Sequence, residues 1–544
     1  MDQRSKIAVL GYGVEGKAML DYLVKHKYDN ITVCDQRVHL KEKMPDGVSV
    51  QLGECYLDNL ENFDVVFRSP GISYLIPEIV KARLAGAEIT SPTQYFLDNC
   101  PCIVVGVTGT KGKGTTSTLT YEILKEAFEK GGYTEREGVY TERSGYTERK
   151  DGGTERSGTE KKNSDAKMAE KTAIKITTKE NGKKRHVYLG GNIGNSPIEF
   201  LDKLKGNDVV VLELSCFQLG DLKKSPHIAV LLNTTSDHLD YYPDRDEYLR
   251  AKELILLHQD EDDVAILNQD YEYSKYYESQ VRGRLVWISP KGEDLSKGLD
   301  EEGAVYINSE DGTANKLIMY SRNGQSMMVM PVRDVALIGS HNIENVCPAI
   351  AVAKEFGIKD KVIAKVIKKF SGLPHRLEFV RKLNNVSYYN DSFSTNPQTS
   401  MAAVDSFDVP TILIAGGSDK GLDYYEWARK ILIKPSLQVV LLIGATSEKM
   451  WDAIETAEKK LKPGEGSPTL VVMCKDLKEA LQKAKKYAAG ILKEGSVGTG
   501  EKIIPGKGVI KTAVVVMSPA AASFDQFKDY KDRGKKFIEW TKEL

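Results

Sequence analysis

Short apolar runs alternate with longer amphipathic stretches along most of the chain. The runs are rich in Val, Ile and Leu and end in Gly, Asn, Asp or Ser, which is typical of buried parallel strands. The stretches between them have helical spacing. Strands are expected at Ile7–Leu10, Ile31–Cys34, Val65–Phe67, Ile103–Val105, Val209–Leu212, Ile228–Leu232, Val264–Leu267, Thr411–Ile414, Val439–Ile443 and Val514–Met517. The pattern predicts an α/β protein with mostly parallel sheets and with ligands at the carboxyl ends of the strands.

The chain has 544 residues, which is too many for a single hydrophobic core. Three domains are predicted from the distribution of strands and turns. Residues 1–100 are expected to form a Rossmann-like domain, and residues 101–372 a central domain with a mostly parallel sheet. Residues 373–544 are expected to form a C-terminal Rossmann-like domain.

A low-complexity stretch interrupts the second segment at residues 130–171. Tyr-Thr-Glu-Arg recurs there, beginning at Tyr133, Tyr140 and Tyr146, with a repeat of about seven residues. Its polar composition, rich in Gly and Ser, cannot bury a core, so a disordered or extended surface insertion is predicted. Two strand-like runs around Asn181-Gly182 are then expected to form a hairpin, namely Ala173–Thr178 and Arg185–Leu189.

The overall composition is that of a soluble globular protein, with 41% hydrophobic and 28% charged residues. A formal net charge of −1 gives no reason to expect a nucleic-acid or membrane partner. No apolar run reaches the length of a membrane span, and the N-terminus has no signal-peptide layout. Seven scattered cysteines fit a reducing cytoplasm, and the close pair Cys100 and Cys102 is interpreted as packing residues.

The most informative motif is a Gly- and Lys-rich loop between the strand at Ile103–Val105 and a following helix. Its glycines let successive backbone N–H groups converge on one anion, and Lys113 can reach terminal phosphates. Hydroxyls for Mg²⁺ are offered by Thr115, Thr116 and Ser117. A flexible Gly/Lys turn is the alternative, but the flanking strand and helix favour nucleotide binding. The predicted ATP-binding residues of this loop are Gly109, Thr110, Lys111, Gly112, Lys113, Gly114 and Thr115.

A second glycine-rich turn follows the first strand of the chain. Gly11-Tyr-Gly-Val-Glu-Gly16 leads into a helix, and Asp35 ends the next strand about twenty residues later, as in Rossmann domains that bind a ribose hydroxyl. The strand at Val65–Phe67 ends in another turn, Arg68-Ser-Pro-Gly71. Two such turns on one edge of a sheet favour a nucleotide-type ligand there.

Two ionisable residues follow strands of the middle segment. Glu213 follows Val209–Leu212 and His238 follows Ile228–Leu232. We therefore expect a carboxylate and an imidazole on adjacent strand ends near the Gly- and Lys-rich loop at residues 109–115, called the phosphate loop below. This arrangement suits Mg²⁺. The alternatives are an edge salt bridge for Glu213 and a turn or cap for His238, and Lys252 resembles a solvated helix lysine in its local sequence.

Further polar residues lie near the junction with the third segment. His341, Asn342 and Asn345 open a helix and fit either helix caps or adenine contacts. Arg376 and Asp391 flank the start of the third segment and could close over a nucleotide held by the second.

With these motifs in order the chain resembles the Mur ligase family over essentially its whole length, apart from the insertion. The resemblance rests on Thr108-Gly-Thr-Lys-Gly-Lys113, Gly191-Asn-Ile-Gly194, Leu212-Glu-Leu-Ser-Cys-Phe-Gln-Leu219, Asp237-His-Leu-Asp240, His341-Asn-Ile-Glu-Asn345, Leu373-Pro-His-Arg376, Asn390-Asp-Ser392 and Ser518-Pro-Ala-Ala-Ala-Ser-Phe-Asp525. It implies a central P-loop ATPase domain between two Rossmann-like domains. It also implies a cytoplasmic, ATP-dependent ligase of peptidoglycan precursor synthesis, expected to be a monomer. Such an enzyme phosphorylates the carboxylate of UDP-N-acetylmuramoyl-L-alanine, and the amino group of D-glutamate then attacks the acyl phosphate.

The resemblance also implies roles for individual residues. Lys113 is implied to contact phosphates, and Mg²⁺ is implied to be held by Thr115, Glu213, His238 and a carbamylated Lys252. Nucleotide contacts are implied for Asn345, Arg376 and Asp391. The residues implied to bind the UDP-sugar substrate are Val14, Glu15, Asp35, Arg37, Gly71 and Asn192. The residues implied to bind D-glutamate are Thr395, Lys420, Ser523 and Tyr530.

Some positions depart from the family pattern. Gly114 after the loop lysine resembles folylpolyglutamate synthases, Phe393 stands where many members have lysine, and Tyr530 stands where phenylalanine is expected. Glu15 and Gln36 make the UDP site less standard. A folylpolyglutamate-type ligase, a Mur-like ligase for another amino acid and a non-catalytic nucleotide-binding scaffold remain alternatives, although the first segment disfavours the folylpolyglutamate type.

The insertion gives a first testable prediction. Deleting residues 133–161 and closing the loop should leave ligase activity near normal and thermal stability similar, because this stretch has too few apolar residues to offset the entropy of ordering it. Turnover and the melting temperature of the shortened chain measure this directly. Loss of folding would instead mean that the insertion packs against the body of the protein.

Overall fold

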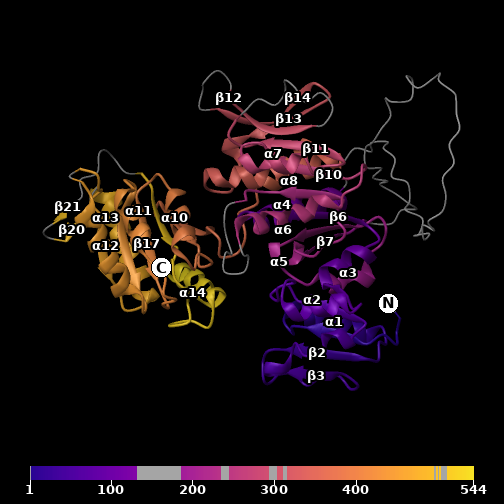
Figure 1. Ribbon diagram of the computed structural model, residues 1–544. Coiled ribbons are helices and arrows are strands. Elements are labelled where there is room, and N and C mark those ends of the chain that lie inside the picture. The colour runs from indigo at the N-terminus through magenta and orange to yellow at the C-terminus, as the bar shows by residue number, and fades with distance from the viewer. Residues whose placement is uncertain are drawn as a thin grey trace. The chain divides into compact units, whose positions relative to one another are not determined.

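The computed structural model describes residues 2–130, 185–234, 244–292, 303–309, 315–462, 464–494, 498–499, 502–503 and 511–544. The chain divides into two compact units, Met1–Val335 with Ile343–Lys368 and Ala336–Asn342 with Lys369–Leu544. The first unit contains two sheets and the second contains another large one (Figure 1). The predicted α/β class with mostly parallel sheets is therefore confirmed. The predicted domain boundaries after residues 100 and 372 stay predictions, and the insertion and the first strand of the expected hairpin lie outside the described residues.

The N-terminal sheet has five parallel strands in the order β3-β2-β1-β4-β5. Its strands are β1 (Ile7–Leu10), β2 (Ile31–Asp35), β3 (Ser49–Leu52), β4 (Val65–Arg68) and β5 (Glu88–Thr90). Its helices are α1 (Val14–Lys25), α2 (Pro77–Leu84) and α3 (Pro92–Asn99). Because β1 lies between β2 and β4, the turns that follow these strands meet at one edge, as the sequence predicted.

The central sheet has nine strands in the order β14-β13-β12-β11-β10-β9-β6-β8-β7. The pairs from β12 to β7 are parallel, and β12, β13 and β14 are antiparallel to one another. The strands are β6 (Ile103–Thr108), β7 (Val187–Gly191), β8 (Val209–Glu213), β9 (Ile228–Leu231), β10 (Val264–Asn268), β11 (Arg284–Ser289), β12 (Ala304–Ser309), β13 (Lys316–Arg322) and β14 (Gln325–Pro331). Strand β6 lies between β8 and β9, so the expectation that β8 and β9 are adjacent is wrong.

The helices of the central region are α4 (Lys113–Lys130), α5 (Cys216–Leu219), α6 (Arg245–Leu257), α7 (Glu272–Glu278), α8 (Ile343–Glu355) and α9 (Asp360–Ile367). Helices α4 to α7 follow its parallel strands, whereas α8 and α9 come after the antiparallel strand β14. Helix α4 packs against α8 and α9 and buries Leu119, Ile123 and Leu124. This packing fixes the helix that begins at the phosphate loop. Within the described part of the chain, no helix is both long and apolar enough to cross a membrane.

The second unit is built on a six-stranded sheet in the order β15-β16-β22-β17-β18-β19. Only the β15–β16 pair is antiparallel. The strands are β15 (Glu378–Leu383), β16 (Val386–Asn390), β17 (Thr411–Gly416), β18 (Leu437–Ile443), β19 (Leu470–Met473) and β22 (Ala513–Met517). A separate two-stranded pair consists of β20 (Gly498–Thr499) and β21 (Lys502–Ile503).

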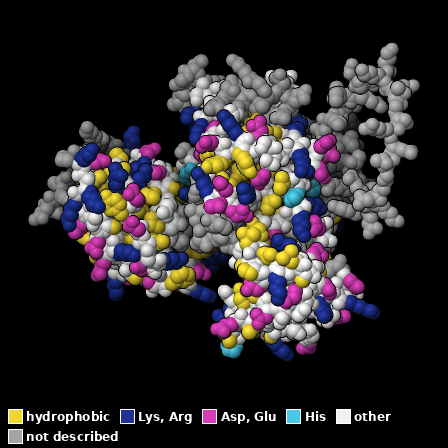
Figure 2. All heavy atoms as spheres, viewed as in Figure 1, with side chains coloured by type: hydrophobic (Ala, Val, Ile, Leu, Met, Phe, Trp, Pro, Cys, Tyr) yellow, Lys and Arg dark blue, Asp and Glu magenta, His cyan; other side chains and the backbone are white. Residues whose placement is uncertain are grey.

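Helices cover both faces of this sheet. They are α10 (Pro397–Asp405), α11 (Tyr425–Ile433), α12 (Ser447–Lys460), α13 (Leu477–Glu494) and α14 (Tyr530–Glu543). Leu413 and Ala415 of β17 face the core under α10, α11 and α12, whereas Ile412 and Ile414 face the core under α13 and α14. Burial on both faces explains why the strand is continuously apolar. On the surface shown in Figure 2, basic and acidic side chains are interspersed.

Candidate active site

The phosphate loop joins β6 to α4 and is shaped by glycines that have no room for a side chain. Gly112 has a φ of 86°, and a Cβ there would lie 2.1 Å from the side-chain oxygen of Asn345. The hydroxyl of Thr116 also donates to the carbonyl of Asn345 at 3.3 Å. Asn345, a predicted nucleotide contact, therefore lies directly against the loop.

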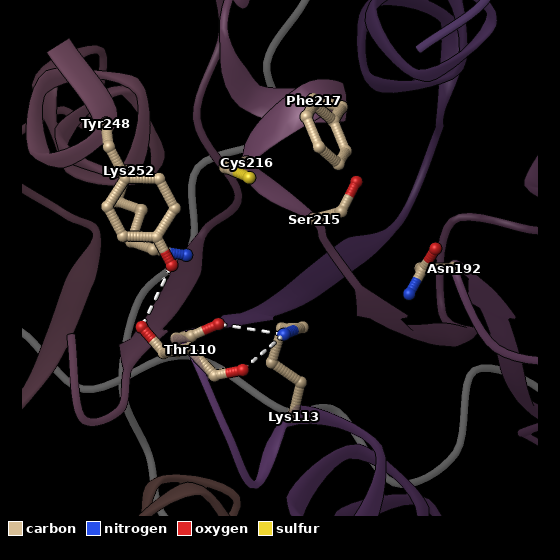
Figure 3. Close-up of a pocket in the computed structure, with 9 residues that line it drawn as sticks. Thr110, Lys113, Asn192, Ser215, Cys216, Phe217, Tyr248 and Lys252 are labelled. Carbon is tan, nitrogen blue, oxygen red and sulfur yellow. Dashed lines mark hydrogen bonds between the residues drawn. The ribbon is translucent and has the colours of Figure 1, made fainter. Parts of the chain in front are cut away.

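Lys113 and Thr115 occupy the first turn of α4. The ammonium group of Lys113 donates to the carbonyls of Gly109 and Thr110 at 2.8 and 3.0 Å, which holds it over the loop (Figure 3). Thr115 is buried at the start of the helix, and Lys111 is exposed on the loop. A loop of this shape with a lysine and a hydroxyl suits a polyphosphate with its cation.

Glu213 ends β8 and is only 5% exposed. Its carboxylate accepts from the side-chain amide of Asn192 at 2.9 Å, and its backbone carbonyl accepts from the N–H of Asn192 at 2.8 Å. Gly191 makes this approach possible, since a Cβ there would lie 2.2 Å from the Glu213 carbonyl. Because β8 pairs directly with β6, Glu213 and Asn192 lie beside the phosphate loop. His238 lies outside the described residues.

Lys252 is the clearest correction to the sequence interpretation. It is 1% exposed, so it is not the solvated helix lysine that its local sequence suggested. Its ammonium nitrogen lies 4.7 Å from the centre of the Tyr248 ring, and the Tyr248 hydroxyl is 2.9 Å from the hydroxyl of Thr110 (Figure 3). Helix α6 thus brings a buried lysine to the phosphate loop.

One cavity of about 240 Å³ connects these groups. It is lined by Gly109, Thr110, Lys113, Asn192, Ser215, Cys216, Phe217, Tyr248 and Lys252. Sequence reasoning did not assign Ser215, Phe217 or Tyr248 a function, although the first two lie in a motif that it singled out. Ser215 caps α5 through a reciprocal pair of hydrogen bonds with Gln218, and this fixes the turn that follows Glu213.

The predicted UDP-binding edge of the N-terminal sheet is organised around Asp35. Its carboxylate accepts from the N–H of Tyr12 at 2.7 Å and from the guanidinium of Arg37 at 2.7 and 2.9 Å. Burial alone would raise the pKa of Asp35, but the hydrogen bonds from Arg37 and Tyr12 outweigh it and lower the pKa to about 2. Asp35 and Arg37 therefore form a charged pair beside the glycine turn. Val14 and Gly71 are both exposed at this edge.

Glu15 extends from the glycine turn toward the central region. Its carboxylate accepts a hydrogen bond of 2.5 Å from the side-chain amide of Gln218. Close by, the fully buried Arg68 forms an ion pair with Asp221 through two nitrogens at 2.8 and 2.9 Å. These contacts join residues that lie about 150 to 200 positions apart in the sequence. They link the carboxyl edge of the N-terminal sheet to the turn at residues 215–217, which lines the cavity.

The second unit gathers its predicted residues on neighbouring strand ends. Asp391 follows β16 and is buried, and it accepts from the N–H of Leu377 at 3.0 Å and from the hydroxyl of Ser518 at 2.6 Å. Burial raises the pKa of Asp391 to about 6, although these hydrogen bonds oppose the shift. The guanidinium carbon of Arg376 lies 3.8 Å from the centre of the Phe393 ring. The Phe393 ring therefore packs against the Arg376 cation, whereas a lysine at this position would itself carry a positive charge.

The predicted D-glutamate residues also lie near this edge. Ser523 follows β22, Lys420 follows β17, and Thr395 follows β16, and these three strands are neighbours in the sheet. Ser523 is buried and Lys420 is exposed. Tyr530 opens α14 and meets the Phe393 ring edge-on, with a centroid distance of 5.2 Å.

A residue that sequence reasoning missed holds these loops together. Arg533 is 1% exposed and donates to the hydroxyl of Ser392 at 3.0 Å and to the carbonyls of Ala521 and Ala522 at 3.1 and 2.9 Å. Burial lowers the pKa of Arg533 to about 10, so it stays charged at neutral pH. Nothing in the local sequence of α14 distinguishes this arginine from a surface residue.

A lysine-bearing phosphate loop beside a strand that ends in a carboxylate is typical of enzymes that transfer the phosphoryl group of a nucleotide. The family model described as "Mur ligase MurD-like, N-terminal domain" matches residues 5–91, and "Mur ligase middle domain" matches residues 166–353. The chain belongs to the Mur ligase family, and it is an ATP-dependent, ADP-forming ligase.

Two curated relatives match almost end to end, and both are named UDP-N-acetylmuramoylalanine–D-glutamate ligase. The protein from Acetivibrio thermocellus is 32% identical over 99% of this chain and 96% of its own length. The protein from Clostridium tetani is 33% identical over 98% of this chain and 95% of its own length. Among solved structures, a UDP-N-acetylmuramoylalanyl-D-glutamyl-2,6-diaminopimelate–D-alanyl-D-alanyl ligase from Acinetobacter baumannii has a TM-score of 0.51 and 14% identity, covering 100% of this chain and 92% of that one. This last likeness concerns the fold alone.

Proposed function

We propose that the protein joins D-glutamate to UDP-N-acetylmuramoyl-L-alanine with the conversion of ATP to ADP and phosphate. The substrates come from the names of the two full-length relatives. The structural observation that carries the proposal is the single cavity that joins the phosphate loop, Asn192 and Lys252. A carboxylate is a poor electrophile, and phosphorylation gives it a leaving group that an amine can displace.

The phosphate loop supplies the nucleotide end of this reaction. Backbone N–H groups from Gly109 to Gly114 hold the phosphates, and the ammonium of Lys113, now resting on loop carbonyls 2.8 and 3.0 Å away, is within reach of the terminal phosphoryl group. Asn345, in contact with Gly112, is the proposed contact to the nucleoside. Arg376 and Asp391 are proposed as further nucleotide contacts.

We propose Mg²⁺ as the cation of this reaction. The hydroxyl of Thr115, the buried carboxylate of Glu213 and the ring of His238 are the proposed ligands, together with Lys252 as a carbamate. Oxygen-rich sets of this kind suit Mg²⁺, which neutralises charge on a phosphoryl group in transfer. Carbamylation would convert the buried lysine from a cation into an oxygen ligand of opposite charge.

The UDP-sugar is proposed to bind at the carboxyl edge of the N-terminal sheet. The first turn of α1, which begins at Val14 and Glu15, has backbone N–H groups without intrahelical partners, and these suit a diphosphate. Asp35 and Arg37 are proposed to hold the nucleoside and Gly71 to border it. Asn192, fixed on Glu213, is proposed to orient the substrate near the phosphate loop.

D-Glutamate is proposed to bind in the second unit. Its two carboxylates require a cation and several hydrogen-bond donors. Lys420 supplies the cation, and the hydroxyls of Ser523, Thr395 and Tyr530 are the proposed donors. Stereochemistry does not follow from these residue types, so the choice of the D-isomer rests on the relatives.

An ADP-release assay with UDP-N-acetylmuramoyl-L-alanine tests the function. We expect rapid release with D-glutamate and little with L-glutamate, L-lysine or diaminopimelate. Faster release with one of those amino acids would overturn the D-glutamate assignment and leave the ligase class intact. ADP release that does not depend on the UDP-sugar would overturn the assignment of the UDP-sugar as the acceptor substrate.

Lys420→Ala should raise the KM for D-glutamate about 10- to 100-fold and leave the KM for ATP nearly unchanged. The expected size is that of a hydrogen bond to a charged group, which acts on ground-state binding. Lys459→Ala is a matched control, because Lys459 is a surface lysine of α12 paired with Glu455. Steady-state kinetics with each substrate varied in turn measures both constants. An unchanged KM for D-glutamate would remove Lys420 from the site.

We further infer that the enzyme works in the cytoplasm as a monomer. All seven cysteines are free, which suits a reducing compartment. Light scattering on the purified chain tests the oligomeric state, and a mass near twice 60.4 kDa would contradict it.

A further inference from the structure

Cys100 and Cys102 form a close pair of thiols at the junction of the two sheets of the first unit. Cys100 is the residue after α3, and Cys102 directly precedes β6. Their sulfur atoms lie 3.6 Å apart. Cys102 is 4% exposed, whereas Cys100 is only partly buried. Cys100 is therefore the more accessible of the two thiols, and the Cys102 sulfur is its close neighbour.

The surroundings make the two thiols chemically different. A hydrogen bond from Cys102 lowers the pKa of the Cys100 thiol despite burial, and the charge of Lys224 acts in the same direction. The hydrogen bond to Cys100 and burial both raise the pKa of Cys102. Lys224 is held in place by donating to the carbonyl of Leu97 at 2.7 Å. A more acidic, accessible thiol beside a less acidic, buried one is the arrangement of an attacking and a resolving cysteine.

The chain between the two cysteines favours ring closure. Pro101 is the only residue between them, and its ring restricts the backbone of the connecting residue. Little conformational freedom is therefore lost when the sulfurs join. A disulfide across a single residue closes a small ring, and strained disulfides are the ones that thiols reduce readily. Such a bond would form and break reversibly.

We propose that Cys100 and Cys102 are a reversible oxidation site that takes a low-molecular-weight disulfide as its oxidant. The Cys100 thiolate attacks one sulfur of the oxidant, forms a mixed disulfide and releases one thiolate. Cys102 then attacks the Cys100 sulfur, and the second thiol leaves as the Cys100–Cys102 bond forms. Two protein thiols lose two electrons and two protons in all, and one oxidant disulfide becomes two thiols. This chemistry does not depend on the ligase reaction.

Glutathione disulfide is the probe, applied to the full chain carrying Cys55→Ser so that the exposed Cys55 cannot react. We expect the mass to fall by about 2 Da and two of the thiols to disappear on titration of the denatured protein, with both changes reversed by excess dithiothreitol. Cys102→Ser in the same background should stop at a stable adduct of about 305 Da on Cys100. Cys100→Ser should show neither change.

Cys34→Ser is the matched control, since Cys34 is buried in the same unit, and it should oxidise like its parent. A stable glutathione adduct on the parent protein would overturn the proposal, because it would mean that Cys102 does not resolve. Loss of two thiols in Cys100→Ser would also overturn it, as would no reaction in the parent.

Discussion

Lys252→Ala is expected to lower turnover about 10³-fold, the size found when a preorganised electrostatic contact is removed from a phosphoryl- or acyl-transfer site. Lys252 is 1% exposed and lines the same cavity as Lys113 and Asn192. As a carbamate it would supply an oxygen ligand for Mg²⁺, and alanine cannot do so. Bicarbonate or a short carboxylic acid added to the alanine variant should restore part of the activity, because either can place an oxyanion in the vacated space. Steady-state ADP release with and without the added acid measures both effects.

Arg250→Ala is the matched control for this experiment. Arg250 lies on the same helix α6 but is largely exposed, with 68% of its side chain accessible. Its removal should leave turnover close to normal, and thermal melting of both variants separates lost folding from lost chemistry. Full activity of Lys252→Ala would rule out the carbamate. Loss of activity without rescue by any small acid would favour a purely structural lysine.

The strands could be predicted because burial on both faces leaves a continuous apolar signature. Val209–Glu213 and Thr411–Gly416 are examples, because every residue of both strands is buried. Their lateral order could not be predicted in the same way. A crossover from β8 to β9 passes over β6, and the sequence between the two strands does not reveal whether a strand is skipped. The phosphate loop therefore lies between the two strand ends that were expected to be neighbours.

The burial of Lys252 could have been predicted from the helical spacing of its apolar neighbours. Tyr248, Lys252 and Ile255 are spaced so that they share one face of a helix, and Tyr248 and Ile255 are buried. A lysine on an apolar face is an exception to ordinary patterning, and such exceptions gather at functional sites. Contacts between distant segments carry no comparable signal. Arg533 meets Ser392 across 141 positions, and only the folded sheet brings them together.

Glu15 is a residue whose protonation is expected to affect stability strongly. The amide of Gln218 donates to one of its carboxylate oxygens at 2.5 Å, and the other oxygen is buried without a hydrogen-bond partner among the described residues. Burial raises the pKa of Glu15 from 4.5 to about 7, opposed by the hydrogen bond from Gln218 and the charge of Arg68 and aided by Asp221. The folded protein therefore binds this proton more tightly than the unfolded chain does.

The sign of the pH effect follows from this difference. Between pH 4.5 and pH 7 the folded state holds more protons at Glu15 than the unfolded state, so the free energy of unfolding falls as pH rises through this window. Above pH 7 the full penalty is present and amounts to about 3 kcal/mol. Glu15→Gln is expected to remove it, since an amide keeps the shape and carries no charge. The variant should gain stability over the wild type at pH 8 and gain almost none at pH 4.5.

Urea denaturation of both proteins at pH 4.5, 6, 7 and 8 measures the effect as a difference between variants. Asp391, whose pKa is also raised, contributes to both curves and cancels in that difference. Glu54→Gln is the control, because Glu54 is exposed and its replacement should shift stability by no more than a few tenths of a kcal/mol at any pH. A stability difference for Glu15→Gln that stays constant from pH 4.5 to pH 8 would mean that the carboxylate is solvated in the folded protein. A difference that grows with pH would identify Glu15 as a buried acid that keeps its proton into the neutral range at the junction between the glycine turn after β1 and the cavity.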